Sequence, residues 1–171
     1  MRDCKYREVI FRHWKIDARG NLHCTLDPTF FAPVRTTGRK KKYLQVQLML
    51  HGRLRWYYIH RLMAFSWLPK PKSRRLRIVD HRNGNSLDNA IENLRWVTSQ
   101  GNNLNRPCYG LVREDGLFYP KVAGHIHYKF GTDDEGTAIM FRKTLVECYV
   151  NYTIRNPDSR SYPHEYIGNY K

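Results

Sequence analysis

The chain has 171 residues, of which 30 are Lys or Arg and 15 are Asp or Glu, so its formal net charge at pH 7 is +15. A hydrophobic fraction of 41%, with 12 Tyr and 4 Trp, excludes a disordered chain and allows one compact domain or two small ones. This charge excess favours a polyanionic partner, first nucleic acid and second an anionic membrane surface; a basic surface without a partner is the remaining alternative.

The sequence contains no sign of membrane insertion or secretion. No stretch approaches the roughly 20 apolar residues of a membrane span, and the N-terminal residues MRDCKYREVIFRHWK lack an apolar signal core. We therefore expect a soluble, cytoplasmic protein with no membrane partner. The cysteines are scattered without the C-x-x-C spacing of a zinc knuckle, so we predict reduced thiols and neither disulfides nor structural zinc.

The N-terminal part, residues 1–57, is predicted to be rich in β-structure. Alternating apolar residues and turn residues predict strands at Val9–Ile16, Asn21–Leu26, Tyr43–Leu50 and Leu54–Ile59. The last two form the clearest hairpin, because His51 and Gly52 supply a turn between them.

Residues 58–106 are predicted to begin with a short buried helix at His60–Leu68, which Pro69 ends. Strands follow at Arg77–His81 and Leu94–Val97, separated by a loop rich in Asn and Asp. Thr98 is a good N-cap for a helix at Ser99–Asn105. Residues 78–106 therefore read as strand, loop, strand and helix.

A third segment, residues 107–152, combines short strands with one amphipathic helix. Strands are predicted at Gly110–Arg113, Phe118–Ala123 and His125–Phe130, and the helix at Thr137–Tyr149. Residues 153–171 are polar and are expected to form a loosely held tail. The predicted fold class is α+β, with a β-rich N-terminal part, a strand-loop-strand-helix core and a C-terminal three-stranded antiparallel sheet plus helix.

Four polar residues of the predicted core are separated by characteristic intervals in the sequence. Asp80 precedes His81, Asn93 lies thirteen residues after Asp80, and Asn102 lies twenty-two after it. With the block N-L-R-W-V-T, this pattern resembles the HNH endonucleases (the ββα-metal or His-Me finger), especially the phage homing endonucleases. The resemblance extends upstream through Y-Y-I-H-R-L and covers about residues 43–106.

The chemistry of DNA hydrolysis explains these residue types. Asp80, His81 and Asn93 are the candidate catalytic residues. A neutral histidine at physiological pH takes a proton from water, so we expect His81 to be the general base. Carboxylate and amide oxygens suit a hard cation, so we expect Asp80 and Asn102 to bind one Mg²⁺ or Mn²⁺ per site, with no small-molecule cofactor. Asn93 is expected to bridge the loop backbone and hold His81 in orientation.

One geometric tension accompanies this interpretation, because adjacent residues of a strand point to opposite faces. Asp80 and His81 can share a site only if one of them lies past the regular strand. The main alternative is a non-catalytic DNA- or RNA-binding protein with a degenerate HNH finger, since basic and aromatic residues also suit RNA.

Double-stranded DNA is the expected partner, held by phosphate contacts from basic residues around the core. The candidates are Arg39, Lys40, Lys41, Lys42, Arg61, Lys70, Lys72, Arg74, Arg75 and Arg77. The protein is expected to act as a monomer or homodimer, in the cytoplasm of a phage-infected host if the homing-enzyme resemblance holds.

The C-terminal segment resembles the plant ethylene-response-factor type of DNA-binding domain, in which three antiparallel strands pack on one helix. The resemblance lies in Y-G-L at residues 109–111, in F-G-T at residues 130–132 and in the helix that follows. It implies that the sheet contacts DNA, with Arg113, Lys121 and Lys129 as the contact residues. The alternative is a small sheet that only packs on the core.

Overall fold

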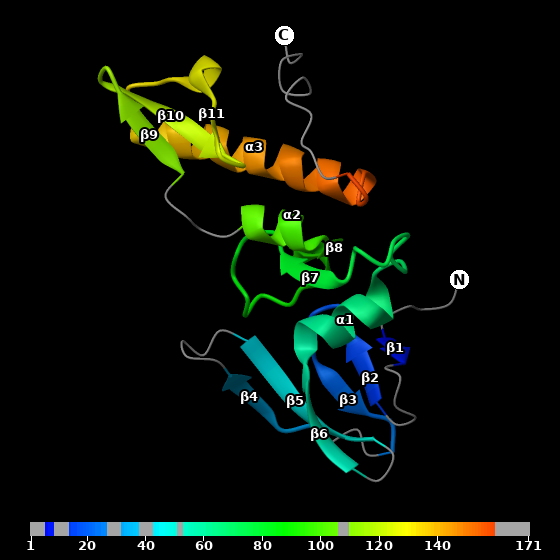
Figure 1. Ribbon diagram of the computed structural model, residues 1–171. Coiled ribbons are helices and arrows are strands. Elements are labelled where there is room, and N and C mark those ends of the chain that lie inside the picture. The colour runs from blue at the N-terminus through cyan, green and yellow to red at the C-terminus, as the bar shows by residue number, and fades with distance from the viewer. Residues whose placement is uncertain are drawn as a thin grey trace. The chain divides into compact units, whose positions relative to one another are not determined.

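The structure is a computed structural model that describes residues 6–8, 14–26, 32–37, 43–50, 53–105 and 110–159 (Figure 1). It combines helices and strands, and the predicted α+β class is confirmed. The chain divides into two compact units. The first unit comprises residues 1–72 and 79–96, and the second comprises residues 73–78 and 97–171.

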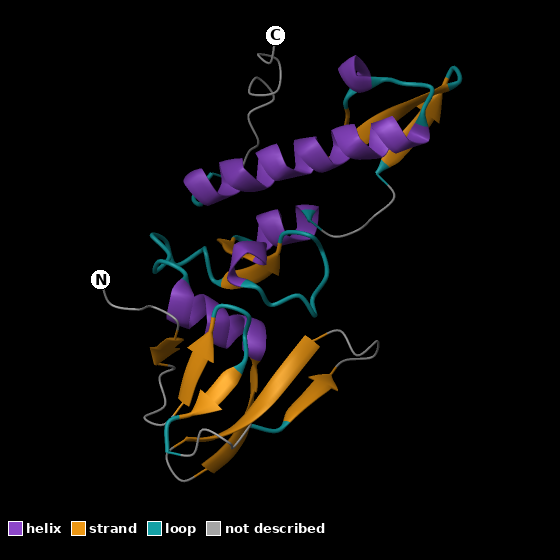
Figure 2. Cartoon of the chain, turned by 180° about the vertical axis from the view of Figure 1, so that it is seen from behind, coloured by secondary structure: helices purple, strands orange, loops and turns teal. Residues whose placement is uncertain are grey.

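Two antiparallel sheets and one helix form most of the first unit (Figure 2). One sheet contains β1 (Tyr6–Glu8), β2 (Trp14–Asp17) and β3 (Leu22–Cys24), and the other contains β4 (Val34–Thr37), β5 (Tyr43–Leu50) and β6 (Arg53–Tyr58). Helix α1 (Ile59–Trp67) follows β6 without a loop. Its apolar face joins both sheets in one core, which includes Ile16, Leu22, Val46, Leu48, Ile59, Leu62, Met63 and Leu94.

The two faces of the β4–β5–β6 sheet differ in composition. Leu44, Val46 and Leu48 of β5 face the core, so the alternate residues of this strand face outward. Pairing with β6 places Gln45 opposite Tyr58 and therefore brings Tyr58 to the outer face near Tyr43, at the end of the sheet where α1 begins. The two tyrosine rings meet edge to face, with their centroids 5.8 Å apart.

The predicted order of strand, loop, strand and helix is present in the middle of the chain. Strands β7 (Ile78–His81) and β8 (Leu94–Val97) form a two-stranded sheet, and the short 3₁₀ helix η1 (Ile91–Asn93) directly precedes β8. Helix α2 (Ser99–Leu104) follows, and the Thr98 side chain accepts a hydrogen bond from the Gly101 amide at 3.0 Å. The predicted N-cap is therefore confirmed.

A third three-stranded sheet and a long helix form most of the second unit. Strands β9 (Leu111–Glu114), β10 (Leu117–Val122) and β11 (His125–Ile126) are antiparallel, with β10 in the centre. The 3₁₀ helix η2 (Tyr128–Phe130) leads to α3 (Glu135–Arg155). The core of this unit is apolar and includes Val97, Val122, Leu145, Val146, Tyr149 and Val150.

Three predicted boundaries in this unit are wrong. The strand expected to reach Phe130 ends at Ile126, because residues 128–130 turn into the 3₁₀ helix. The helix expected at Thr137–Tyr149 begins at Glu135, where Asp134 caps it by accepting a hydrogen bond from the Thr137 amide at 2.6 Å. It continues to Arg155, so residues 153–155 are helical and do not belong to a loose tail.

Strand β4 was not expected from its sequence. Residues 9–13 of the strand predicted at Val9–Ile16 lie outside the described residues, and so do residues 160–171 of the predicted tail. In the part of the chain that the structure describes, no helix combines the length and apolar character needed to cross a bilayer.

Candidate active site

Asp80 and His81 end strand β7, and both side chains are buried, with relative exposures of 7% and 6%. A turn follows at once, in which the Gly84 amide donates to the His81 carbonyl at 2.9 Å. The two side chains contact different elements, and His81 is the last residue of β7, directly before the turn. Asp80 contacts β8, and His81 contacts the loop and α1.

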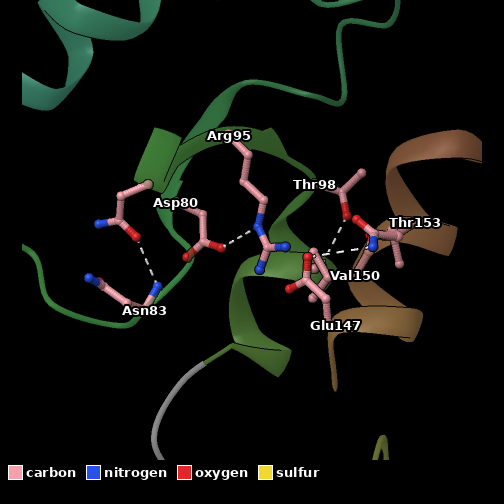
Figure 3. A network of polar contacts seen from close by, with 10 residues as sticks. Asp80, Asn83, Arg95, Thr98, Glu147, Val150 and Thr153 are labelled. Carbon is pink, nitrogen blue, oxygen red and sulfur yellow. Dashed lines mark hydrogen bonds and ion pairs between the residues drawn. The ribbon is translucent and has the colours of Figure 1, made fainter. Parts of the chain in front are cut away.

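Asp80 forms a buried ion pair with Arg95 of β8 (Figure 3). The Arg95 Nε donates to Asp80 Oδ2 at 2.9 Å, and Arg95 is only 4% exposed. A buried carboxylate is costly unless a positive charge and hydrogen bonds compensate it, and this guanidinium provides both. Arg95 is the Arg of the N-L-R-W-V-T block, and the sequence pattern alone assigns no role to it.

His81 is held by Asn89 of the loop between β7 and β8. The His81 Nε2 lies 3.3 Å from Asn89 Oδ1, and Asn89 is 5% exposed. The Asn89 Nδ2 donates to the Leu87 carbonyl at 3.2 Å. Both polar atoms of the Asn89 side chain therefore have a hydrogen-bond partner, the oxygen in His81 and the nitrogen in the Leu87 carbonyl.

A cluster of rings covers another side of His81. The ring centroid of His60 lies 5.2 Å from that of His81, and the Tyr43 and Tyr58 rings each lie 5.4 Å from His60. The pKa of His60 is lowered to about 4, mainly by burial and to a smaller extent by electrostatic interaction with the nearby His81 and Arg61. His60 is therefore neutral at physiological pH, and its buried Nδ1 has no hydrogen-bond partner among the described residues.

Asn93 bridges the two ends of the loop, as the sequence led us to expect. Its Oδ1 accepts from the Asn83 amide at 3.0 Å, and its Nδ2 donates to the Asp88 carbonyl at 2.8 Å. Its own carbonyl accepts from the Arg82 amide at 2.8 Å. The His81 ring itself contacts the Asn89 side chain, so the hydrogen bonds of Asn93 support His81 through the loop that they close.

Asn102 lies on α2, in the second unit, where it is half-buried. Its backbone amide donates to the Thr98 carbonyl at 3.0 Å. The neighbouring Gly101 packs closely against α3, because a Cβ built at this position would lie 2.7 Å from Thr153 Oγ1. Thr153 in turn donates to the Val150 carbonyl at 2.8 Å (Figure 3). The structure thus fixes Asn102 within its own unit.

The donor atoms of the predicted metal ligands indicate which class of metal ion they suit. The described residues contain no group of three or more His, Cys, Asp or Glu side chains able to hold a metal ion. Asp80 and Asn102 offer only oxygen ligands. Mg²⁺ is commonly bound by one or two carboxylates together with phosphate and water, so these residues fit a hard divalent cation.

The predicted DNA-contact residues that the structure describes lie on the surface. The exposed basic side chains are Arg61, Lys70, Lys72, Arg74, Arg75, Arg77, Arg113, Lys121 and Lys129. Arg75 pairs with the exposed Asp158 at 3.1 Å. The run Arg39–Lys42 lies outside the described residues.

The strand register of the second unit separates two of these cations. Arg113 pairs with Phe118, and its guanidinium lies 5.2 Å from the Phe118 ring, whereas Lys121 is three residues along β10 from Phe118. Because side chains alternate along a strand, Arg113 and Lys121 point to opposite faces of the sheet. One face of this sheet therefore cannot present both residues to DNA.

Comparisons with known proteins match the segment that contains these residues. Residues 57–104 match the family described as HNH endonuclease. An uncharacterized HNH endonuclease, L247 of Acanthamoeba polyphaga mimivirus, is 43% identical over 44 residues, which are 26% of this chain and 11% of the viral protein.

A solved structure also matches, described as DNA binding and cleavage by the HNH homing endonuclease I-HmuI. It aligns with a TM-score of 0.45 and 24% identity over 56% of this chain and 53% of its own. The chain thus spans about a tenth of the viral relative and about half of the solved chain. Residues 57–104, which contain Asp80, His81, Asn93 and Asn102, are similar to HNH endonucleases.

Proposed function

We propose that this protein is a DNA endonuclease that hydrolyses phosphodiester bonds in double-stranded DNA, with a divalent metal ion and a preferred cleavage site. The observation that carries the proposal is the buried, doubly supported His81 beside Asp80, within the segment that matches HNH endonucleases. A histidine held in this way is suited to proton transfer, because its ring orientation is set before the substrate binds.

His81 is the proposed general base. Hydrolysis requires a water molecule to lose a proton as it attacks phosphorus, and a positioned imidazole accepts that proton. Neutral His60 packs beside His81 and adds no positive charge that would oppose protonation of His81. Asn89 and Asn93 hold the ring and the loop in place.

Asp80 and Asn102 are the proposed ligands for one Mg²⁺ or Mn²⁺ ion. When bound, such an ion would stabilise the charge that develops on the phosphate and on the departing oxygen. The Arg95 guanidinium orients the Asp80 carboxylate through Oδ2. The remaining protein contribution is electrostatic, since the exposed Arg and Lys residues around the core neutralise DNA phosphates.

The C-terminal sheet and helix are proposed as an additional DNA-binding module of the ethylene-response-factor type. Its order of three antiparallel strands and one helix supports this proposal. Because Arg113 and Lys121 lie on opposite faces, we expect this sheet to contact mainly phosphates through one face. Separate Lys121→Gln and Arg113→Gln variants identify the face that contacts DNA. Only the substitution on that face should weaken binding to duplex DNA.

A non-catalytic DNA- or RNA-binding protein is the second candidate, and the Asp80–Arg95 pair is the observation that favours it. A carboxylate neutralised by a buried guanidinium also suits a finger that keeps its fold but has lost its chemistry. Binding to duplex DNA, single strands and structured RNA, compared at matched salt, separates DNA from RNA as the partner.

The decisive experiment is cleavage of supercoiled plasmid by the wild-type protein and by His81→Ala, each with Mg²⁺ or with EDTA. We expect conversion only with wild type and metal, and a loss of about 10²-fold or more in rate for the variant. Open circles would indicate nicking by a monomer with one site, and linear plasmid would indicate a dimer that cuts both strands. A pooled genomic DNA library provides the recognition site if the plasmid lacks it; binding without cleavage of that library would favour the second candidate.

A further inference from the structure

The polar environment of His81 contains a residue that neither the sequence pattern nor the comparisons assign to the reaction. Asn89 is buried, and its Oδ1 lies 3.3 Å from His81 Nε2. It is eight residues from His81 in the chain, within the Asn-rich loop, where its composition alone indicates only a turn.

The orientation of the Asn89 amide follows from its second hydrogen bond. A backbone carbonyl accepts and does not donate, so the group that lies 3.2 Å from the Leu87 carbonyl must be the amide nitrogen. The group that faces His81 is then the amide oxygen, which only accepts. His81 Nε2 must therefore carry a hydrogen.

This requirement selects one form of the neutral His81 ring. A neutral imidazole has one donor nitrogen and one acceptor nitrogen, and the hydrogen bond made by one nitrogen determines the role of the other. With the hydrogen on Nε2, the lone pair that accepts a proton is on Nδ1. We propose that Asn89 is a positioning residue that selects the Nε2–H tautomer of His81 and thereby makes Nδ1 the catalytic base; this inference rests on the proposed function.

Several contacts hold Asn89 in place. The neighbouring Asp88 carboxylate accepts from the Ala90 amide at 3.3 Å and from Asn83 Nδ2 at 2.7 Å, and its carbonyl accepts from Asn93. The Ile91 amide donates to the Ala18 carbonyl at 3.2 Å and so ties the loop to the β2–β3 turn. This turn also lies close to Asn89, since a Cβ built on Gly20 would be in van der Waals contact with Asn89 Cβ, at 3.5 Å.

The direct test is NMR of ¹⁵N-labelled histidine side chains in the folded protein without metal or DNA. The His81 resonances are assigned by their absence from the spectrum of His81→Gln. At a pH where His81 is neutral, we expect the nitrogen shifts of wild type and of Asn89→Asp to show a protonated Nε2. In Asn89→Leu, the shifts should move toward those of a mixture of tautomers. A protonated Nδ1 in wild type, or an unchanged spectrum in Asn89→Leu, would overturn the proposal.

Cleavage kinetics give a second readout that separates positioning from folding. Asn89→Leu should lower the single-turnover cleavage rate by about 10- to 100-fold, by analogy with the hydrogen-bond partners that orient metal-ligating histidines, while the Kd for DNA stays within about two-fold. Asn89→Asp keeps an acceptor and should restore most of the rate. The control is Asn151→Leu on α3, which removes an amide far along the chain and should leave the rate unchanged.

These outcomes also separate the two proposals. Absence of cleavage by the wild type refutes the proposed function, whereas the NMR experiment tests the tautomer without any activity. Loss of DNA binding or of cooperative unfolding in both Asn89 variants, with the rate of the remaining folded protein unchanged, would show a structural role and overturn the inference.

Discussion

The two units of this protein bury different kinds of side chain. In the first unit, charged, imidazole and amide groups are buried beside one another: His60, Asp80, His81, Asn89, Asn93 and Arg95. In the described part of the second unit, the buried polar side chains are those of Thr98 and Thr153. Each hydroxyl forms a hydrogen bond with a nearby backbone group, of Gly101 and of Val150 respectively. Burial of polar groups costs stability, so their concentration in one unit marks where chemistry is expected.

The second unit differs from the first because its described core is almost entirely apolar. Its core is aliphatic and aromatic, and most of its described Lys and Arg side chains are exposed, Arg142 being half-buried. Such a unit gains stability from apolar burial and offers charge for binding. Substitutions of buried polar groups should therefore have their largest effects in the first unit, although the predicted metal ligand Asn102 lies in the second. The following substitutions test this division.

The largest effect is expected from breaking the buried ion pair of the first unit. Arg95→Leu leaves the Asp80 carboxylate buried without its positive partner, and we expect a loss of about 3–5 kcal/mol in the free energy of unfolding. Urea denaturation followed by tryptophan fluorescence measures it. The matched control in the second unit is Arg75→Leu, which breaks the exposed pair with Asp158 and should cost about 0–1 kcal/mol. Equal losses in the two variants would contradict the division.

The second effect is a pH dependence caused by His60. Burial lowers the pKa of this histidine to about 4, whereas in the unfolded chain it is about 6.5. Because the unfolded state binds the proton more readily, stability is fully present above pH 6.5 and is lost as pH falls toward 4, by about 3 kcal/mol at most. His60→Phe should remove this part of the acid destabilisation. Parallel unfolding curves of wild type and variant from pH 8 to pH 4 would contradict it.

An intermediate effect is expected at the turn that supports Asn89. Gly20 has φ of +90°, and a Cβ there would lie 3.3 Å from Ile59 Cγ2. Gly20→Ala should therefore cost about 1–3 kcal/mol from backbone strain and lower cleavage by displacing the loop. Gly116→Ala is the control, because its φ of +81° carries the same strain but no atom lies within 4 Å of the built Cβ. It should lose stability and retain cleavage.

The smallest effect is expected from the cap of α2. Thr98→Ala removes the hydrogen bond to the Gly101 amide and should cost about 1 kcal/mol, measured as a shift in the denaturation midpoint. Thr98→Ser keeps the acceptor and should recover most of this loss. If α2 also orients Asn102 for metal binding, Thr98→Ala should raise the Mg²⁺ concentration needed for half-maximal cleavage. A full loss of cleavage at saturating Mg²⁺ would instead place Thr98 in the catalytic step.

The sequence by itself determined the local features of this protein. The alternation in Tyr43–Leu50, the strand Leu94–Val97 and the cap at Thr98 depend on neighbouring residues, and each occurs as predicted. Strand β4 was missed for the converse reason. Its residues Val34–Thr37 are mostly exposed and lack an apolar pattern of their own, and they form a strand because β5 offers a pairing edge.

Only the tertiary structure decided which side chains meet in the site. Arg95 reaches Asp80 across the β7–β8 pair, Asn89 rather than Asn93 reaches His81, and His60 arrives from α1 through the packing of the first core. These contacts depend on strand register and on the path of a twelve-residue loop between Arg82 and Asn93, neither of which a local pattern specifies. The spacing of Asp, His and Asn therefore predicted the class of chemistry, whereas the residues that contact Asp80 and His81 could be identified only from the tertiary structure.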